Sequence, residues 1–252
     1  MMSSTQANTN YSEPEYAKSQ DRAKMPYYTV DIANHLVPET QDLLEKYSKI
    51  PRDQQIEHVH FIRDKAWDIR AYPCIGLGVW LTPQLCRLPV YESILARVKN
   101  GAVLMDVGTF IGHDLRRLVY DGAPSEKVIG VDIVNHFDLG YEFFCDLGRF
   151  HGQFIEADFL SSSPELMALK GQIDIILVSQ LLHQWDWDNQ VKALETLISF
   201  TKPGSSIVGN QIGNQVAQSV AVEQLPSVVT WRHNQKSFAQ MFEEAGKATG
   251  SH

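Results

Sequence analysis

The stretch AVLMDVGTFIG, residues 102–112, decides the fold class of this chain. It begins with four apolar residues, as a short buried strand does, and passes through Asp106 to a turn with glycine at positions 108 and 112. Gly108 allows a tight turn and a close approach of the backbone to a ligand. Gly112 opens the following helix, whose first N–H groups favour a carboxylate. Taken alone, the pattern fits a plain strand-to-helix turn equally well.

Four more apolar runs follow, at residues 128–131, 153–157, 173–178 and 206–209, and helical segments near 112–121, 137–148 and 187–200 lie between them. Short apolar runs that alternate with helices predict a parallel sheet with helices on both faces. We therefore expect a Rossmann-like α/β domain over residues 101–252. The first three strands end in Asp106, Asp132 and Asp158, which suggests a polar ligand spread across the carboxyl edge of the sheet.

The chain before residue 101 has a different character. Residues 1–24 are polar and poor in aliphatic side chains, so we expect a disordered arm. Residues 25–100 contain helical patterns at 39–49, 52–70 and 89–98 and are rich in aromatic side chains. We predict that this region is a helical cap that closes over a substrate.

Composition excludes several functions. The formal net charge of −8 disfavours nucleic-acid binding, and the Arg116-Arg117 pair is expected to lie on a solvated helix face. Three widely spaced cysteines suggest neither a disulfide framework nor a zinc site, and no other cluster of metal ligands is present. We find no secretory leader and no apolar run long enough for a membrane span, so we expect a cytoplasmic protein.

The turn and the acidic strand ends fit S-adenosylmethionine (SAM). Asp132, 26 residues after Asp106, can accept hydrogen bonds from both ribose hydroxyls. The turn lacks the G-x-G-x-x-G pattern that a pyrophosphate needs, which argues against NAD. Asp158 is predicted either to bind the adenine amino group or to cap a helix, and Phe159 to pack on the adenine. The predicted cofactor-binding residues are Asp106, Gly108, Thr109, Gly112, Asp132, Ile133, Asp158, Phe159 and Gln180.

His183 is the candidate catalytic residue, because it follows the fourth strand and would face the reactive methyl group. A single histidine can equally serve as a structural hydrogen-bonding group. Trp185 and Trp187 could line a substrate pocket or simply pack in the core. The predicted substrate-binding residues are Tyr28, Trp80, His183 and Trp185.

Several segments resemble class I methyltransferases, and more closely the fungal methyltransferases of meroterpenoid and related polyketide-hybrid pathways. They are YPCIG (72–76), GHDLRRLVYDGAPS (112–125), DLGYE (138–142), FIEAD (154–158), HQWDW (183–187), KPGS (202–205) and GNQIG (209–213). The resemblance implies SAM as cofactor, S-adenosylhomocysteine (SAH) as product, and O-methylation of a carboxyl or hydroxyl group on a small secondary-metabolite intermediate of polyketide or terpenoid type.

Two departures from the family pattern matter. Thr109 stands where relatives usually carry a smaller residue, often cysteine, which should not abolish SAM binding. The sequence also ends soon after a predicted helix at 235–245, so we expect the antiparallel strand hairpin that usually completes the sheet to be absent or truncated, or its edge to be covered by a partner. An exposed sheet edge favours association, so homodimer formation or reduced solubility is expected.

Two other functions stay open. One is an isomerase or cyclase that retains SAM only as a positive charge or a structural ligand, which SAM binding without SAH production would indicate. The other is a non-catalytic methyltransferase-like partner protein, which the presence of Gly108, Gly112 and Asp132 disfavours.

Overall fold

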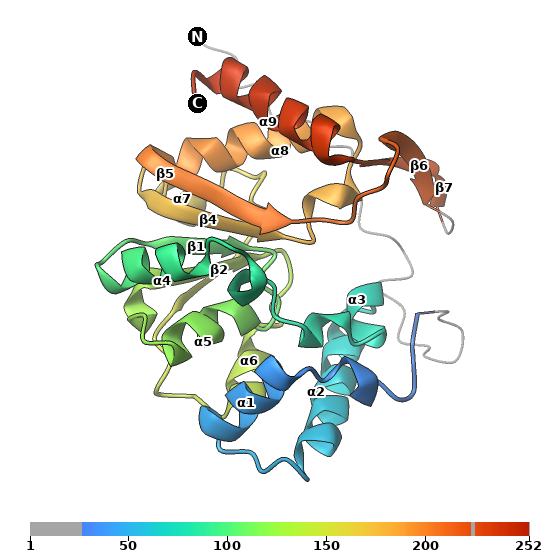
Figure 1. Ribbon diagram of the computed structural model, residues 1–252, viewed down its shortest axis with the longest axis vertical. Helices are drawn as coiled ribbons and strands as arrows, with labels where there is room; N and C mark the ends of the chain where they lie inside the picture. The colour runs from blue at the N-terminus through green and yellow to red at the C-terminus, as the bar shows by residue number, and fades with distance from the viewer. Residues whose placement is uncertain (1–26, 223–224, 252) are drawn as a thin grey trace.

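A five-stranded parallel sheet forms the centre of the molecule in the computed structural model, which describes residues 27–222 and 225–251 (Figure 1). The strand order is β3-β2-β1-β4-β5, as a doubly wound sheet requires. The strands are β1 (Leu104–Val107), β2 (Val128–Asp132), β3 (Gln153–Glu156), β4 (Ile173–Ser179) and β5 (Thr201–Asn210). The predicted α/β fold is confirmed. β1 begins at Leu104 rather than at residue 102 and continues past Asp106 to Val107.

Helices cover both faces of the sheet, since neighbouring residues of a strand point to opposite sides. Leu104 joins one hydrophobic cluster and Met105 the other. The helices on the Leu104 side are α4 (Tyr91–Lys99), α5 (His113–Tyr120) and α6 (Phe137–Phe144). Those on the Met105 side are α7 (Pro164–Met167), α8 (Trp187–Phe200) and α9 (Gln235–Thr249). Both clusters are fully apolar, which explains the continuous apolar runs in the sequence.

Between β5 and α9 in the sequence, β6 (Gln218–Val222) and β7 (Leu225–Arg232) form an antiparallel hairpin. This hairpin is a separate two-stranded sheet. It lies beyond the carboxyl end of β5 (Figure 1). The sequence analysis missed this hairpin, because its strands contain Gln218, Ser219, Pro226 and Ser227 and lack a long apolar run. Within the described residues the outer edge of β5 has no paired strand.

The N-terminal region packs against the sheet domain through its own hydrophobic cluster. Its helices are α1 (Pro38–Lys46), α2 (Gln55–Ile69) and α3 (Pro73–Gly76), and short 3-10 turns occur at Ala33–His35, Val79–Leu81 and Leu85–Arg87. Side chains of this region share the cluster with Ile111, Leu139, Phe143 and Phe144 of the α/β domain. α2 contacts α6 directly, so the region is continuous with one side of the sheet domain.

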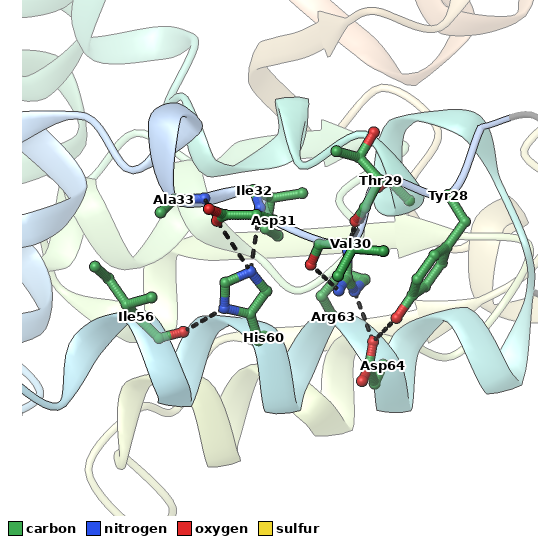
Figure 2. Close-up of polar contacts among 11 residues, drawn as sticks. Tyr28, Thr29, Val30, Asp31, Ile32, Ala33, Ile56, His60, Arg63 and Asp64 are labelled. Carbon is green, nitrogen blue, oxygen red and sulfur yellow. Dashed lines mark hydrogen bonds and ion pairs between the residues drawn. The ribbon is translucent and has the colours of Figure 1, made fainter.

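Residues 28–33, which lead into the first 3-10 turn, are here called the N-terminal strap. Arg63 of α2 fastens this strap (Figure 2). Its guanidinium donates to the carbonyl oxygens of Thr29 at 2.6 Å and Val30 at 3.2 Å, and to the carboxylate of Asp64 at 2.7 Å. The Tyr28 hydroxyl donates to the same carboxylate at 2.5 Å. Because Arg63 is only 2% exposed, these bonds hold the strap to α2 in a largely dry environment.

Arg116 corrects one expectation from the sequence. It is fully buried, and its Nε donates to Asp146 at 3.1 Å in an ion pair that is 0% exposed on both sides. Its neighbour Arg117 is 20% exposed and pairs with Asp121 at 2.7 Å. The prediction of a solvated face was therefore wrong for Arg116, because the acid that compensates it lies 30 residues away in the sequence.

Candidate active site

The turn between β1 and α5 has an unusual backbone. Gly108, Phe110 and Gly112 all have positive φ angles, of 79°, 53° and 71°. A Cβ atom at Gly112 would lie 2.7 Å from the Phe137 ring and would also collide with Arg116, so only glycine fits there. The turn thus places backbone, rather than side chains, at the start of α5, as the sequence predicted.

Asp132 ends β2 directly beside this turn. Its carboxylate accepts the N–H of Phe110 at 2.9 Å and that of Val134 at 3.2 Å. Burial raises the pKa of Asp132 to about 6, although these N–H groups act in the opposite direction. A carboxylate has about four lone-pair sites, so acceptor capacity remains for ribose hydroxyls.

The three strand-end aspartates do not lie at one level. Asp106 pairs in register with Gly130, two residues before Asp132, which places it deeper by about 6.6 Å along the strands. Asp106 is 5% exposed, and burial, followed by the charge of Asp114, raises its pKa well above the usual value. Asp132 is therefore the better placed of the two for a direct contact with a ligand.

Two other predicted cofactor residues are Thr109, within the turn, and Ile133, next to Asp132. Thr109 is 5% exposed. Ile133 is 48% exposed, which is unusual for an isoleucine beside a buried sheet. An exposed aliphatic surface next to the carboxylate predicted to bind ribose suits the face of an adenine ring.

Asp158 and Phe159 follow β3. The Asp158 carboxylate accepts the N–H of Leu160 at 2.9 Å in a local turn, and the cap of α7 is Ser163. The helix-cap alternative for Asp158 is therefore wrong. Phe159 is 6% exposed and packs edge-on against Trp185 at 5.9 Å, so its core contact is clear and its contact with adenine stays a prediction.

Gln180 belongs to a hydrogen-bonded chain of amide side chains at the carboxyl ends of β4 and β5. It has a φ of 54°, and its Nε2 donates to Asn210 at the end of β5 at 2.8 Å. Asn210 in turn donates to Gln84 at 2.8 Å. The sequence analysis did not single out Gln84 or Asn210, because amides at strand ends carry no distinctive spacing.

His183 lies in the 3-10 turn Leu182–Gln184 that follows β4. Neither ring nitrogen makes a hydrogen bond within the described residues, and Nδ1 is buried. Burial, and to a lesser extent the charge of Arg232, lowers the pKa of His183 to about 4. The ring is therefore neutral at physiological pH, and no carboxylate orients it as in a catalytic triad.

The predicted substrate-binding aromatics also have packing roles. The hydroxyl of Tyr28 is bound to Asp64. Trp80 packs edge-on, at 5.5 Å between ring centroids, against Phe110 of the turn at 108–112, which we call the predicted cofactor turn. Trp185 is 6% exposed. Of these three side chains, Trp80 is the one in ring contact with the predicted cofactor turn, so it is the strongest substrate-binding candidate in the N-terminal region.

Within residues 27–222 and 225–251, no three or more histidine, cysteine, aspartate or glutamate side chains are grouped so that they could hold a metal ion. In the same ranges, no helix has both the length and the apolar composition needed to cross a bilayer.

Comparison with known proteins agrees with this geometry. Residues 27–81 match the family model described as the meroterpenoid methyltransferase N-terminal domain. The O-methyltransferase atr3 of Stereocaulon alpinum is 36% identical over 95% of this chain and 70% of its own length. The Asnovolin E/Chermesin D methyltransferase nvfJ of Aspergillus novofumigatus is 38% identical over 84% of this chain and 77% of its own length.

Among solved structures, the 1,6-didemethyltoxoflavin-N1-methyltransferase of Burkholderia thailandensis, crystallised with S-adenosylhomocysteine, shares the fold. It aligns with a TM-score of 0.51 and 16% identity, over 68% of this chain and 70% of its own. With the parallel sheet, the glycine turn and two relatives above 30% identity, the chain belongs to the family of fungal methyltransferases that includes the meroterpenoid enzymes.

Proposed function

We propose that this protein is an O-methyltransferase that moves the methyl group of SAM to a carboxyl or hydroxyl oxygen of a small secondary-metabolite intermediate. The observation that carries the proposal is the glycine turn at 108–112 beside the Asp132 carboxylate, at the carboxyl edge of the sheet. Asp132 would hold the ribose, Ile133 the adenine, and the turn the methionine part. The family membership supports the same reaction.

SAM supplies an electrophilic methyl carbon: an attacking acceptor oxygen forms an O–C bond while the C–S bond breaks and leaves its electron pair on sulfur, giving SAH. The protein's part is to bind, to orient and to exclude water, and positioning of this kind is worth about 7–11 kcal/mol. A carboxylate acceptor is already deprotonated. A hydroxyl acceptor must lose its proton, and His183 is the candidate base.

Calorimetric titration of the protein with SAM and with SAH tests the cofactor. We expect micromolar binding of both, and Asp132→Ala should weaken SAM about tenfold to a hundredfold through the loss of charged hydrogen bonds. Asp53→Ala, on the exposed surface, is the matched control and should bind like the wild type. Equal affinity of Asp132→Ala and the wild type would exclude the assigned site.

The same titration has a pH signature. Because the pKa of Asp132 is raised to about 6, its carboxyl becomes protonated below that pH, and SAM affinity should fall as the pH drops from 7 to 5. Asp114 also has a pKa of about 6, so Asp132→Asn is needed to identify the source. If Asp132 is responsible, that variant loses most of the pH dependence along with affinity.

His183→Ala separates the two acceptor types. With a carboxylate acceptor, kcat should change less than about tenfold, while with a hydroxyl acceptor the loss of a base should cost about 10²- to 10⁴-fold. A base with a pKa of about 4 is weak, which favours the carboxylate. SAH formation with matched acids and phenols measures the difference. A severe loss of kcat with a proven carboxylate acceptor would contradict this difference between the two acceptor types. As a control, the SAM affinity of His183→Ala should equal that of the wild type.

Three further expectations belong to this proposal. The N-terminal region, residues 25–100, would act as a lid over the acceptor, since Trp80 contacts the cofactor turn.

Light scattering would show a homodimer if the outer edge of β5 mediates association, and a monomer at high concentration would count against it. Expression with a fluorescent fusion would test the predicted cytoplasmic location. The predicted arm at residues 1–24 lies outside the described residues.

The two alternatives give different outcomes in one assay. SAM binding without SAH formation over a panel of acceptors would favour the isomerase or cyclase. Absence of SAM binding would favour a non-catalytic partner protein. The intact turn and Asp132 disfavour the non-catalytic partner protein, and the methyltransferase relatives support methyl transfer over isomerisation or cyclisation.

A further inference from the structure

Arg232 lies on a hairpin strand that is fastened to the segment around His183. It ends β7, where it pairs in register with Gln218 of β6. The N–H of the preceding residue, Trp231, donates to the carbonyl of Trp185 at 2.8 Å, and the carbonyl of Trp231 accepts from Gln190 at 3.0 Å. The hairpin is thus fastened to the segment that carries His183, so the backbone of Arg232 has little freedom.

The side chain of Arg232 reaches that segment directly. Its Nη1 donates to the carbonyl oxygen of His183 at 2.6 Å. The charge of Arg232 also acts on the His183 ring, whose pKa it helps to lower. The guanidinium therefore lies beside the turn that follows β4, where the sequence predicted the acceptor to meet the methyl group.

Arg232 has no counter-ion among the described residues. It forms no ion pair with a carboxylate there, and burial lowers its pKa. Arg63, Arg116 and Arg117 each pair with an aspartate. Arg97 has no such pair either, but it donates to Ser206 and to two backbone carbonyls, whereas the described bonds of Arg232 comprise one, to the carbonyl of His183. A half-buried guanidinium without an acid is unfavourable unless a ligand supplies the negative charge.

We propose that Arg232 binds the negatively charged group of the methyl acceptor, so that the site selects carboxylate-bearing acceptors over neutral ones. The inference rests on the proposed methyl transfer and assigns a residue and a charge preference to it. A guanidinium has five N–H donors in a planar fork, and the described bond to His183 uses one of them. One carboxylate oxygen can bind the fork while the other is methylated.

The assignment explains two other features of the site. Burial, with a smaller contribution from the charge of Arg232, lowers the pKa of His183 and keeps its ring neutral, which suits an acceptor that needs no base. The carbonyl of His183 fixes one end of the guanidinium, so the remaining donors are oriented before the acceptor arrives. Preorganised donors are the means by which enzymes gain specificity for charged groups.

Paired probes test the charge preference without knowledge of the natural acceptor. Benzoate and benzamide, and 2-naphthoate and 2-naphthamide, are titrated into protein saturated with SAH. In the wild type we expect each acid to bind at least about tenfold more tightly than its amide. Arg232→Gln should abolish this preference with the amide affinities unchanged, and Arg232→Lys should keep part of it.

Thermal unfolding and SAH affinity are measured for every variant, so that a folding defect is separated from a loss of acid binding. A purely structural role would lower the melting temperature of Arg232→Gln but leave the acid-to-amide ratio intact, and that result would overturn the proposal. Absence of acid preference in a wild type that binds SAH would also overturn it. A wild type that fails to bind SAH would instead refute the proposed function.

Discussion

Replacement of Asp146 with alanine should lower the free energy of unfolding by about 3–5 kcal/mol, the range typical for removal of one partner from a buried ion pair. The variant would leave the Arg116 guanidinium charged in a position that is 0% exposed. It would also remove the acceptor for the Tyr47 hydroxyl, which donates to Asp146 at 2.8 Å. Two groups, the Arg116 guanidinium and the Tyr47 hydroxyl, therefore lose their shared partner at once.

The surroundings of Arg116 explain why water cannot replace Asp146. Four aromatic rings enclose the guanidinium carbon at 4.1–5.3 Å, and they belong to Phe137, Tyr141, Phe144 and Phe150. Ring faces attract a cation but offer no hydrogen-bond acceptor of carboxylate strength. Arg116 also donates to the carbonyl of Ile111 in the cofactor turn at 2.8 Å, so its displacement should disturb SAM binding as well.

Urea unfolding followed by circular dichroism measures this effect. Asp42→Ala is the control, because Asp42 is 39% exposed and pairs with Lys46 on the surface, where a loss of less than about 1 kcal/mol is expected. Arg116→Met and the double variant complete the cycle, and the double variant should be less destabilised than the sum of the single ones. A loss below 1 kcal/mol for Asp146→Ala would show that the pair is not structurally important.

The strand and helix pattern could be predicted from the sequence because it is local. Runs such as Leu104–Met105 face two helical layers, so both faces of each inner strand select apolar residues. The cofactor turn was predictable for the same reason. The positive φ angle of Gly112 is a property of the turn itself, and Asp132 follows at the usual distance of one helix and one strand.

Other features depend on partners far along the chain. Arg116 looked solvated because nothing near it in sequence marks Asp146 as its partner. Asp158 looked like a possible helix cap, but Ser163 occupies that position and lies one residue before the proline that starts α7. Arg232 was not singled out, since its hairpin has no periodic apolar pattern and its carbonyl partner is a backbone atom of His183.

The two halves of the proposed site therefore differ in how the sequence encodes them. The cofactor half consists of strand ends and one turn, which the sheet fixes in place. The acceptor half includes Arg232 from a hairpin that is separate from the sheet. A hairpin outside the sheet can change without disturbing the core, which suits a part of the site that determines which acceptor is methylated.

Replacement of Arg63 with alanine is the second change for which we expect a large effect. It should lower the free energy of unfolding by about 4 kcal/mol, because it leaves a cavity and because partly buried carbonyl groups lose their donor. Arg63 is 2% exposed and donates to the carbonyls of Thr29 and Val30. Without it the N-terminal strap keeps two bonds to side chains of α2, from the Tyr28 hydroxyl to Asp64 at 2.5 Å and from Ile32 N–H to His60 Nε2 at 3.1 Å (Figure 2). Because the carbonyls of Thr29 and Val30 between these bonds lose their donor, the strap should loosen from α2 before the whole protein unfolds.

Limited proteolysis and urea unfolding distinguish this local release from a general loss of stability. In Arg63→Ala, cleavage within residues 28–33 should accelerate under conditions in which the sheet domain stays intact. Arg52→Ala is the matched control, since Arg52 is 45% exposed and its ion pair with Glu45 lies at the surface. Arg63→Lys keeps the charge but not the fork of donors, so it should be intermediate. Equal cleavage of the strap in Arg63→Ala and the wild type would mean that apolar packing of the N-terminal region, rather than Arg63, fixes the strap.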